Sequence, residues 1–306
     1  MSVWNFSREL SLWNPSWGAV SKPPKLAQAR AYCAHVARSH YENFAVVSFL
    51  LPRRLIPHFH AVYAYCRWSD DLADETSGGA ETLQLIDSWR QELLACYGGQ
   101  PRHPVMIALQ DTIHRFAIPP EPFLNLLVAF TQDQQIKTYT TFEQLRGYCI
   151  NSANPVGHLL LHLFGCFDVQ RAALADEVCT GLQLANFWQD VSRDFDIGRI
   201  YLPAEDRRRF GYSEEDLAAK RCTPAFRALL RFEVERARGF FDRGEALLPL
   251  LPLEVRVDVD LFIRGGRAIL AAIERADYDV WSHRPEVTKR KKLKLLLGAI
   301  VRRWFW

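Results

Sequence analysis

Two acidic motifs of identical spacing are the residues of this sequence that most clearly suggest chemistry. Asp70 and Asp74 form a D-x-x-x-D pattern, the first motif, and Asp190 and Asp194 repeat it as the second motif. Four residues make about one helical turn, so the two carboxylates of each motif lie on one face of a helix. Carboxylates ~5 Å apart repel by about 3 kcal/mol at an effective dielectric near 20. A bound cation would offset that cost.

Magnesium is the cation that suits these motifs. The ligands are oxygens without a neighbouring Cys or His, which favours Mg²⁺ over zinc. Mg²⁺ held by a few carboxylates completes its coordination with water and phosphate oxygens, so the sequence predicts a phosphate or diphosphate substrate. The alternative is that both motifs are ordinary solvated helix faces, because acidic pairs at this spacing are common. Their recurrence within apolar and aromatic stretches favours a site.

The faces that carry the motifs continue upstream. Tyr63 and Arg67 share the face of the first motif, and Gln183 and Asn186 share the face of the second. Aromatic residues also flank both motifs, and such residues are more often core than functional. Any that line a pocket suit a carbocation, because ring faces attract positive charge without acting as nucleophiles.

Competing site motifs are weaker. His158 and His162 are also four residues apart, but no acidic residue adjoins them, so we expect a core or cavity-lining role. The sequence has no H-E-x-x-H, no G-x-x-x-x-G-K-[ST], no G-x-G-x-x-G and no E-x-x-H. These absences disfavour a zinc hydrolase, a P-loop enzyme, a Rossmann dehydrogenase and a di-iron bundle respectively.

The elements that must position both motifs are helices. Apolar residues recur at three- and four-residue spacing, and no train of alternating β-branched segments separated by hairpin signals is found. The pattern predicts an all-α fold. The expected helices cover residues 24–40, 54–75, 81–97, 103–116, 121–133, 142–167, 171–194, 224–247, 253–277 and 288–303.

One helical domain over residues 1–306 is the expected organisation. Gly and Pro punctuate the helices at 77–79, 98–101 and 119–120, but none of these breaks is long enough for a flexible linker between domains. Residues 1–23 form a Trp-rich N-terminal segment, and residues 287–306 form a basic amphipathic tail.

Composition excludes several classes of protein. The chain is 49% hydrophobic and 24% charged, which excludes disorder, and its net charge of +3 does not suggest a nucleic-acid partner. Its seven cysteines form no C-x-x-C pair and are odd in number, which argues against a disulfide or zinc framework and fits a reducing cytosol. Neither a signal-peptide core nor an apolar run of ~20 residues is found.

Basic charge is concentrated at the C-terminal end. Residues 289–306 carry seven basic residues and no acidic one, so residues 1–288 have a net charge of −4. Near anionic lipid each basic residue contributes ~1 kcal/mol, and Trp304, Phe305 and Trp306 are typical interfacial anchors. The tail therefore predicts a membrane surface as a partner. The alternative is an ordinary solvated terminal helix.

The residues around both motifs resemble the squalene/phytoene synthase family over roughly residues 28–277. The resemblance rests on the two motifs, on segment 63–75, and on Asn186 together with segment 198–203. Further segments look like the bacterial hydroxysqualene synthase branch of hopanoid biosynthesis: 41–44, 51–54, 152–157 and 186–190.

This resemblance implies an isoprenoid synthase fold, with helices around a central apolar cavity and both Asp motifs at its mouth. By position it implies Mg²⁺ ligands at Asp70, Asp71, Asp74, Asn186, Asp190 and Asp194. It implies substrate contacts at His40, Arg67, Tyr148, Asn186, Arg199 and Tyr201. The four Asp residues of the two motifs would be catalytic.

The implied reaction converts presqualene diphosphate to hydroxysqualene by diphosphate ionisation, carbocation rearrangement and water capture. Two enzymatic alternatives stay open: hydride capture to squalene, and head-to-head condensation of two prenyl diphosphates to squalene, phytoene or dehydrosqualene. Condensing members usually carry Arg directly before the second motif, where this chain has Gln189. NADPH is not expected, although the missing Rossmann pattern does not exclude it. A membrane-associated helical scaffold with an inactive pocket is the non-enzymatic alternative.

The expected location follows from this chemistry and from the tail. We expect a cytoplasmic protein, peripheral on the inner face of the cytoplasmic membrane. Upstream and downstream squalene-pathway enzymes are further candidate partners.

Overall fold

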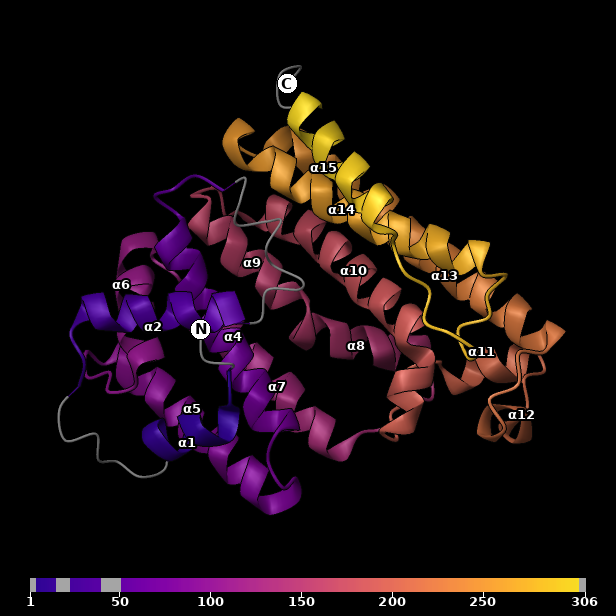
Figure 1. Ribbon diagram of the computed structural model, residues 1–306, viewed down its shortest axis with the longest axis horizontal. Coiled ribbons are helices and arrows are strands. Elements are labelled where there is room, and N and C mark those ends of the chain that lie inside the picture. Colours follow the sequence, from indigo (N-terminus) through magenta and orange to yellow (C-terminus); the bar gives the residue numbers. More distant parts are fainter. Residues whose placement is uncertain (1–3, 15–22, 40–50, 303–306) are drawn as a thin grey trace. The chain divides into compact units, whose positions relative to one another are not determined.

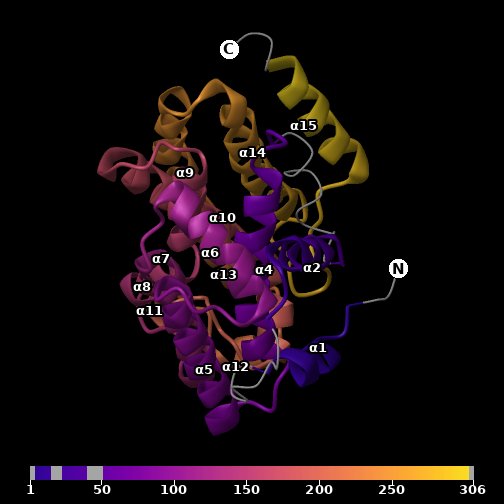
Figure 2. The same ribbon diagram turned by 90° about the vertical axis from the view of Figure 1, so that its left-hand side faces the viewer.

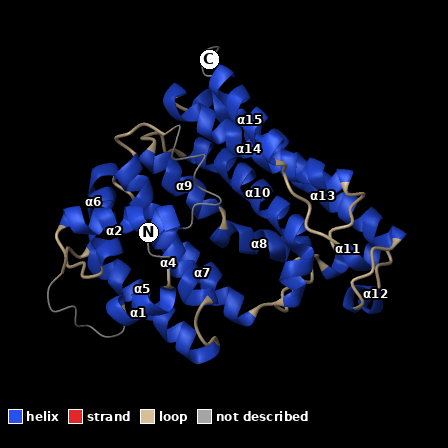
Figure 3. Ribbon diagram, viewed as in Figure 1, coloured by secondary structure: helices blue, strands red, loops and turns tan. Residues whose placement is uncertain are grey.

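The structure, a computed structural model, describes residues 4–14, 23–39 and 51–302, and the regular elements in these ranges are helices (Figure 3). One isolated bridge joins Thr138 and Ile200. Figure 1 labels the helices, whose bounds are α1 (Phe6–Trp13), α2 (Leu26–Ser39), α4 (Ile56–Asp74), α5 (Gly79–Tyr97), α6 (Pro104–Phe116), α7 (Glu121–Gln135), α8 (Phe142–Ser152), α9 (Asn154–Leu163), α10 (Val169–Asp196), α11 (Ala204–Arg209), α12 (Glu214–Ala218), α13 (Pro224–Gly244), the 3₁₀ helix η2 (Glu245–Leu250), α14 (Leu253–Arg275) and α15 (Lys289–Arg302). The predicted all-α class is confirmed.

Two compact units make up the chain. The N-terminal unit comprises Met1–Gln135 and His158–Phe167, and the C-terminal unit comprises Ile136–Gly157 and Asp168–Trp306. The first motif belongs to the N-terminal unit and the second motif to the C-terminal unit. The predicted single domain and central cavity stay predictions.

The N-terminal unit is built on α4, which packs against α2, α5, α6 and α7. On the buried face of α4, Trp68 stacks on Trp89 with ring centroids 5.5 Å apart, and the Tyr65 hydroxyl donates to the Phe123 carbonyl at 3.0 Å. Large buried rings remove much apolar surface from water, so this face fixes the rotation of α4. The opposite face of its last turns carries the first motif.

The C-terminal unit is built on α10, which packs against α13 and α14. Phe241 of α13 fills the space left by two glycines, Gly181 on α10 and Gly266 on α14. A Cβ on Gly266 would lie 2.2 Å from the Phe241 ring carbon Cζ, so only glycine fits there. These close helix contacts hold α10, whose last turns carry the second motif.

The prediction of one helix over residues 142–167 was wrong. The structure has two helices there, α8 and α9, which meet at Ala153. Pro155 has no N–H to donate to the carbonyl four residues earlier, so one α-helix cannot continue through this point. The sequence reading also left out three short helices, α1, α11 and α12.

Helix α15 runs beside α14 within the C-terminal unit (Figure 2). Its Ala299 is fully buried, and the Arg302 guanidinium bonds the buried Asp260 carboxylate, with Nε 2.9 Å from Oδ2. The tail up to Arg302 is therefore a docked helix. Among the residues that the structure describes, no helix combines the length and the hydropathy needed to cross a bilayer.

Candidate active site

The first motif lies on the exposed side of α4. The Asp70 side chain is 42% exposed, and Asp74, one turn later, is also exposed. Arg67 precedes them on the same side and its Nη1 lies 3.1 Å from Asp70 Oδ2. The predicted face is therefore present: two accessible carboxylates with a guanidinium next to them.

Asp71 differs from its neighbours because it is completely buried. Arg67 forms an ion pair with it, and the indole Nε1 of Trp4 donates to Asp71 Oδ2 at 3.1 Å. Burial raises the pKa of Asp71 to about 7, although the bonds from Arg67 and Trp4 oppose that rise. This carboxylate links α4 to the N-terminal segment, and its predicted role as a metal ligand stays a prediction that its burial does not favour.

The second motif lies on one side of the last turns of α10. Asn186 is exposed, Asp190 is buried except for 12% of its side chain, and Asp194 is half-buried. Burial, and after it the negative charge of Asp190, raise the pKa of Asp194 to about 7. The charge of Asp190 therefore disfavours the ionised form of Asp194, an effect that a divalent cation would reverse.

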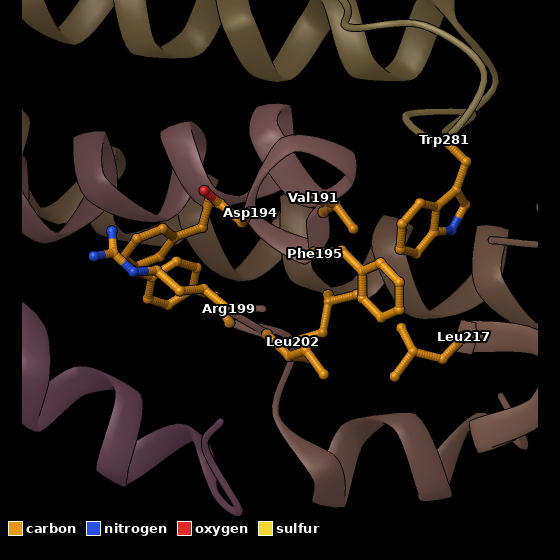
Figure 4. Close-up of a pocket in the computed structure, with 10 residues that line it drawn as sticks. Val191, Asp194, Phe195, Arg199, Leu202, Leu217 and Trp281 are labelled. Atoms are coloured by element: carbon orange, nitrogen blue, oxygen red, sulfur yellow. The ribbon is translucent and has the colours of Figure 1, made fainter. Parts of the chain in front are cut away.

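Arg199 reaches Asp194 because the chain turns sharply after α10. Gly198 has φ = 77°, a left-handed conformation that favours glycine, and the Arg199 N–H donates to the Asp194 carbonyl at 2.8 Å. The side chains of Asp194 and Arg199 lie on the same side of this turn (Figure 4). The positive charge of Arg199 acts to lower the pKa of Asp194, against the larger effect of burial.

Aromatic rings form a continuous cluster beside this turn. Tyr201 stacks on Phe187 with centroids 3.8 Å apart and on Tyr139 at 5.8 Å, and the Tyr148 ring lies 6.0 Å from Tyr201. The structure thus brings together Tyr148 and Tyr201, both predicted from the resemblance. Tyr139 was not predicted, because it joins the cluster through the bridge between Thr138 and Ile200, which no local spacing reveals.

A small cleft adjoins the same turn (Figure 4). Asp194 and Arg199 lie at one end, and Phe195, Leu217 and Trp281 lie at the other. Its volume of about 10 Å³ is the size of one water molecule. The cleft does not hold a prenyl chain.

Arg284 is a site residue that the sequence reading missed. It lies between α14 and α15, and its Nε and Nη2 donate to Asp190 Oδ1 and Oδ2 at 2.5 and 2.9 Å. Ninety-four residues separate the two in sequence. A pattern of three and four residues cannot reveal such a pair.

The donor set of each motif fits magnesium. Within residues 4–14, 23–39 and 51–302, no group of three or more His, Cys, Asp or Glu side chains is assembled to hold a metal ion. Each motif offers two carboxylates, and Mg²⁺ is usually held by one or two carboxylates, with water and substrate oxygens completing its shell. Burial is the largest cause of the raised pKa of Asp194, but the repulsion from Asp190 that adds to it is a repulsion that a cation would relieve.

The remaining histidines singled out in the sequence are His40, His158 and His162. His40 and segment 41–44 lie outside the described residues. In the N-terminal unit the His162 ring stacks on Phe167 at 4.2 Å, and the His158 ring meets Phe167 edge-on at 5.7 Å. Burial lowers the pKa of His162. These contacts fit the packing role expected for the histidine pair.

Comparisons with known proteins identify relatives along nearly the whole chain. The family model described as squalene/phytoene synthase matches residues 26–291. The crystal structure of squalene synthase HpnC from Alicyclobacillus acidocaldarius is similar at 45% identity and a TM-score of 0.80, covering 84% of this chain and 97% of that one. A dehydrosqualene synthase, solved in complex with a ligand, matches at 26% identity and a TM-score of 0.82, with 92% and 98% covered.

Curated sequences agree with these structures. The 15-cis-phytoene synthase of Synechocystis sp. is 31% identical over 308 residues, covering 96% of this chain and 91% of its own length. The phytoene synthase of Arthrospira platensis is 30% identical over 293 residues, with 92% and 95% covered.

Proposed function

The chain belongs to the squalene/phytoene synthase family, a family of prenyltransferase-type enzymes with the all-α isoprenoid synthase fold, and on this premise we propose that it converts presqualene diphosphate to hydroxysqualene. The observation that carries the proposal is the end of α10. There the carboxylates of the second motif adjoin Arg199 and an aromatic cluster that includes Tyr201. Carboxylates that would bind a cation and aromatic rings that would line a carbocation site therefore lie on consecutive turns of one segment.

Departure of the diphosphate is the first step that these residues would assist. We assign the holding of Mg²⁺ to Asp70, Asp74, Asp190 and Asp194, with Asn186 as an additional oxygen donor. Mg²⁺, when bound, supplies positive charge that stabilises the departing diphosphate. Arg67 and Arg199 would bond diphosphate oxygens through their planar guanidinium groups. The bond from carbon to diphosphate then ionises without a protein nucleophile.

The aromatic cluster would govern the carbocation that remains. Phe187 and Tyr201 stack on each other, so the outer faces of this cluster, with Tyr148 beside it, would stabilise positive charge without forming a covalent bond with it. Apolar walls also exclude bulk water, so that rearrangement precedes capture. One positioned water molecule then adds to the rearranged cation, and loss of its proton gives the hydroxyl group of hydroxysqualene.

Product identification separates this proposal from its alternatives. The purified protein is given presqualene diphosphate or farnesyl diphosphate with Mg²⁺, with and without NADPH. Hydroxysqualene from presqualene diphosphate without NADPH supports the proposal. Squalene formed only with NADPH, or any C30 product from farnesyl diphosphate alone, favours hydride capture or condensation respectively. The absence of Mg²⁺-dependent diphosphate release favours the scaffold.

The metal assignment predicts the effect of single substitutions. Asp70→Ala and Asp190→Ala should each lower turnover about 10²-fold or more, as does deletion of a preorganised charge stabiliser in other enzymes. The control is Asp196→Ala, also on α10, whose carboxylate is 62% exposed and pairs with Lys220. Steady-state release of diphosphate checks all three variants. Near-normal turnover of either motif variant contradicts the metal assignment.

A peripheral position at the inner face of the cytoplasmic membrane completes the proposal. Leu293, Leu297 and Val301 of α15 are each more than half exposed and lie four residues apart on one side of the helix. The adjoining residues 289–292 and 294 are basic and exposed. An apolar stripe with flanking cations fits the interface of an anionic lipid leaflet. The substrate and the product both carry long apolar chains, which favours a location at the membrane surface. Pathway enzymes that share them are candidate neighbours there.

A further inference from the structure

The segment that joins α14 to α15, residues 276–288, is fixed within the C-terminal unit on both sides of Arg284. On one side Trp281 is buried, with its ring 5.6 Å from the Phe195 ring and 5.5 Å from the Phe226 ring. On the other side the carbonyl of the buried Pro285 accepts a bond of 2.6 Å from Gln189 Nε2. The backbone is therefore held in place on both sides of Arg284.

The guanidinium of Arg284 occupies both oxygens of Asp190. Its Nε donates to Oδ1 at 2.5 Å and its Nη2 donates to Oδ2 at 2.9 Å. The same Nη2 lies 2.9 Å from Gln189 Oε1, so the amide of Gln189 bonds Arg284 with one end and Pro285 with the other. A two-point bond from a planar guanidinium to a carboxylate is strong and directional. Gln189 is buried, which protects this arrangement from water.

These two oxygens are the ones that a divalent cation needs from Asp190. A cation that bonds Asp190 is repelled by the positive charge of Arg284, which is already in place. Water screens this repulsion only partly, because the Asp190 side chain is 12% exposed and that of Arg284 is 28% exposed. Arg193 also lies near, with Nη1 3.7 Å from Asp190 Oδ1, but its side chain is 68% exposed. Water therefore screens Arg193 far more than Arg284.

We propose that Arg284 is a counter-ion lock on the second motif, which holds Asp190 in the metal-free protein and must release at least one of its oxygens before Asp190 binds a divalent cation. The inference rests on the proposed function, because it takes Asp190 as a metal ligand. Gln189 is the positioning residue of the lock, since it joins the guanidinium to the fixed backbone. The lock weakens cation binding at the second motif.

Binding of Mn²⁺ to the full-length protein tests the lock without any turnover. The free Mn²⁺ concentration is followed by its electron paramagnetic resonance signal for wild type, Arg284→Gln and the matched control Arg193→Gln. Removing the poorly screened charge of Arg284 should tighten Mn²⁺ binding about tenfold, whereas removing the exposed charge of Arg193 should change it less than about threefold. Arg284→Lys keeps the charge without the two-point bond, so an intermediate affinity is expected.

A second variant tests the lock even if Arg284→Gln does not fold. Gln189→Met keeps the volume and removes both amide bonds while Arg284 remains, and it should tighten Mn²⁺ binding by a smaller factor of about three. Far-UV circular dichroism and thermal unfolding establish which variants are folded. If Arg284→Gln binds Mn²⁺ no more tightly than wild type, or if Arg193→Gln changes the affinity as much, the lock is overturned.

Asp190→Asn separates failure of the lock from failure of the metal site. If Asp190→Asn weakens Mn²⁺ binding while Arg284→Gln leaves it unchanged, the metal site stands and only the lock fails. If Asp190→Asn leaves Mn²⁺ binding unchanged, Asp190 is not a ligand and both proposals fail. If Arg284 acts by holding Asp190, adding Arg284→Gln to Asp190→Asn should bring no gain in affinity.

Discussion

His103 is a buried imidazole that the fold requires in its neutral form. Its ring meets Trp68 and Trp89 edge-on, with centroids 4.5 and 4.8 Å away. Its Nδ1 accepts a bond from the Val105 N–H at 3.1 Å and so caps α6. A protonated ring cannot accept that bond, and burial lowers the pKa of His103 to about 3.

The free energy of unfolding should therefore fall in acid. Between pH 6.5 and pH 3 the unfolded chain binds a proton at His103 that the folded chain does not, so stability decreases as the pH is lowered. From pH 7 to pH 5 this one group should cost about 2 kcal/mol. His103→Asn keeps a capping acceptor and should lose about 2 kcal/mol less over that interval, measured by urea unfolding. His114→Asn, exposed on the same helix, should behave as wild type.

Asp194 should give the free energy of unfolding a pH dependence of the opposite sign. The folded protein binds its proton more tightly than the unfolded chain, so the metal-free protein loses stability as the pH rises from about 4 to about 7. Asp194→Asn removes that loss and should stabilise the metal-free protein by about 2 kcal/mol at pH 8, allowing for partial exposure, and by little at pH 4. Chemical unfolding of wild type and variant in EDTA measures it. An equal effect at both pH values would show that burial of the Asp194 charge is not the cause.

The arginines that pair with the two motifs show which contacts residue spacing predicts and which it does not. Arg67 lies three and four residues before Asp70 and Asp71, so the helical repeat alone predicts its contacts. Arg284 reaches Asp190 only through the path of the loop after α14, and Trp4 reaches Asp71 across 67 residues. Local chemistry was therefore predictable, and the partners supplied by tertiary structure were not.

Among the helices, α10, α13 and α14 depend on the absence of side chains at two positions. Phe241 occupies the volume beside Gly266, so Gly266→Ala should overpack the interface and cost about 1–3 kcal/mol. Gly265 is its neighbour on α14, and a Cβ there meets no atom within 4 Å. Gly265→Ala should instead stabilise the protein by up to about 1 kcal/mol through helix propensity. Thermal unfolding of both variants checks the contrast, and equal shifts would refute it.

The helices that carry the motifs were predicted well, because each shows a strong repeat between clear breakers. The expected ranges 54–75 and 171–194 differ from α4 and α10 by two residues at most at each end. Helix α1 was not predicted, since its eight residues make only about two turns, too few for the repeat of Phe6, Leu10 and Trp13 to stand out. Its Phe6 is nevertheless buried against Trp68. Tertiary contacts stabilise this helix more than its own sequence does.

Over the full length of the protein, charge is divided unequally along the chain. The last 18 residues carry +7, and the 288 before them carry −4. This asymmetry favours approach to an anionic surface with α15 first.

Sedimentation with vesicles containing phosphatidylserine tests this orientation. Replacing Lys289, Arg290, Lys291 and Lys292 with Gln should weaken binding at least tenfold, because each cation contributes up to ~1 kcal/mol. Replacing the apolar stripe, Leu293, Leu297 and Val301, with Ser should weaken it by a similar factor. Val169→Ser, at an apolar position on α10 that is still more exposed, is the control. If all variants sediment with the vesicles as wild type does, α15 has no role in membrane binding.

The two compact units are interleaved along the chain. The N-terminal unit takes residues up to 135 and then 158–167, so residues 136–157 of the other unit come between its parts. A ribosome releases the chain in order, and the N-terminal unit is therefore complete only after residue 167 has emerged. Residues 136–157 likewise leave the ribosome before residues 168–306, with which they form the C-terminal unit.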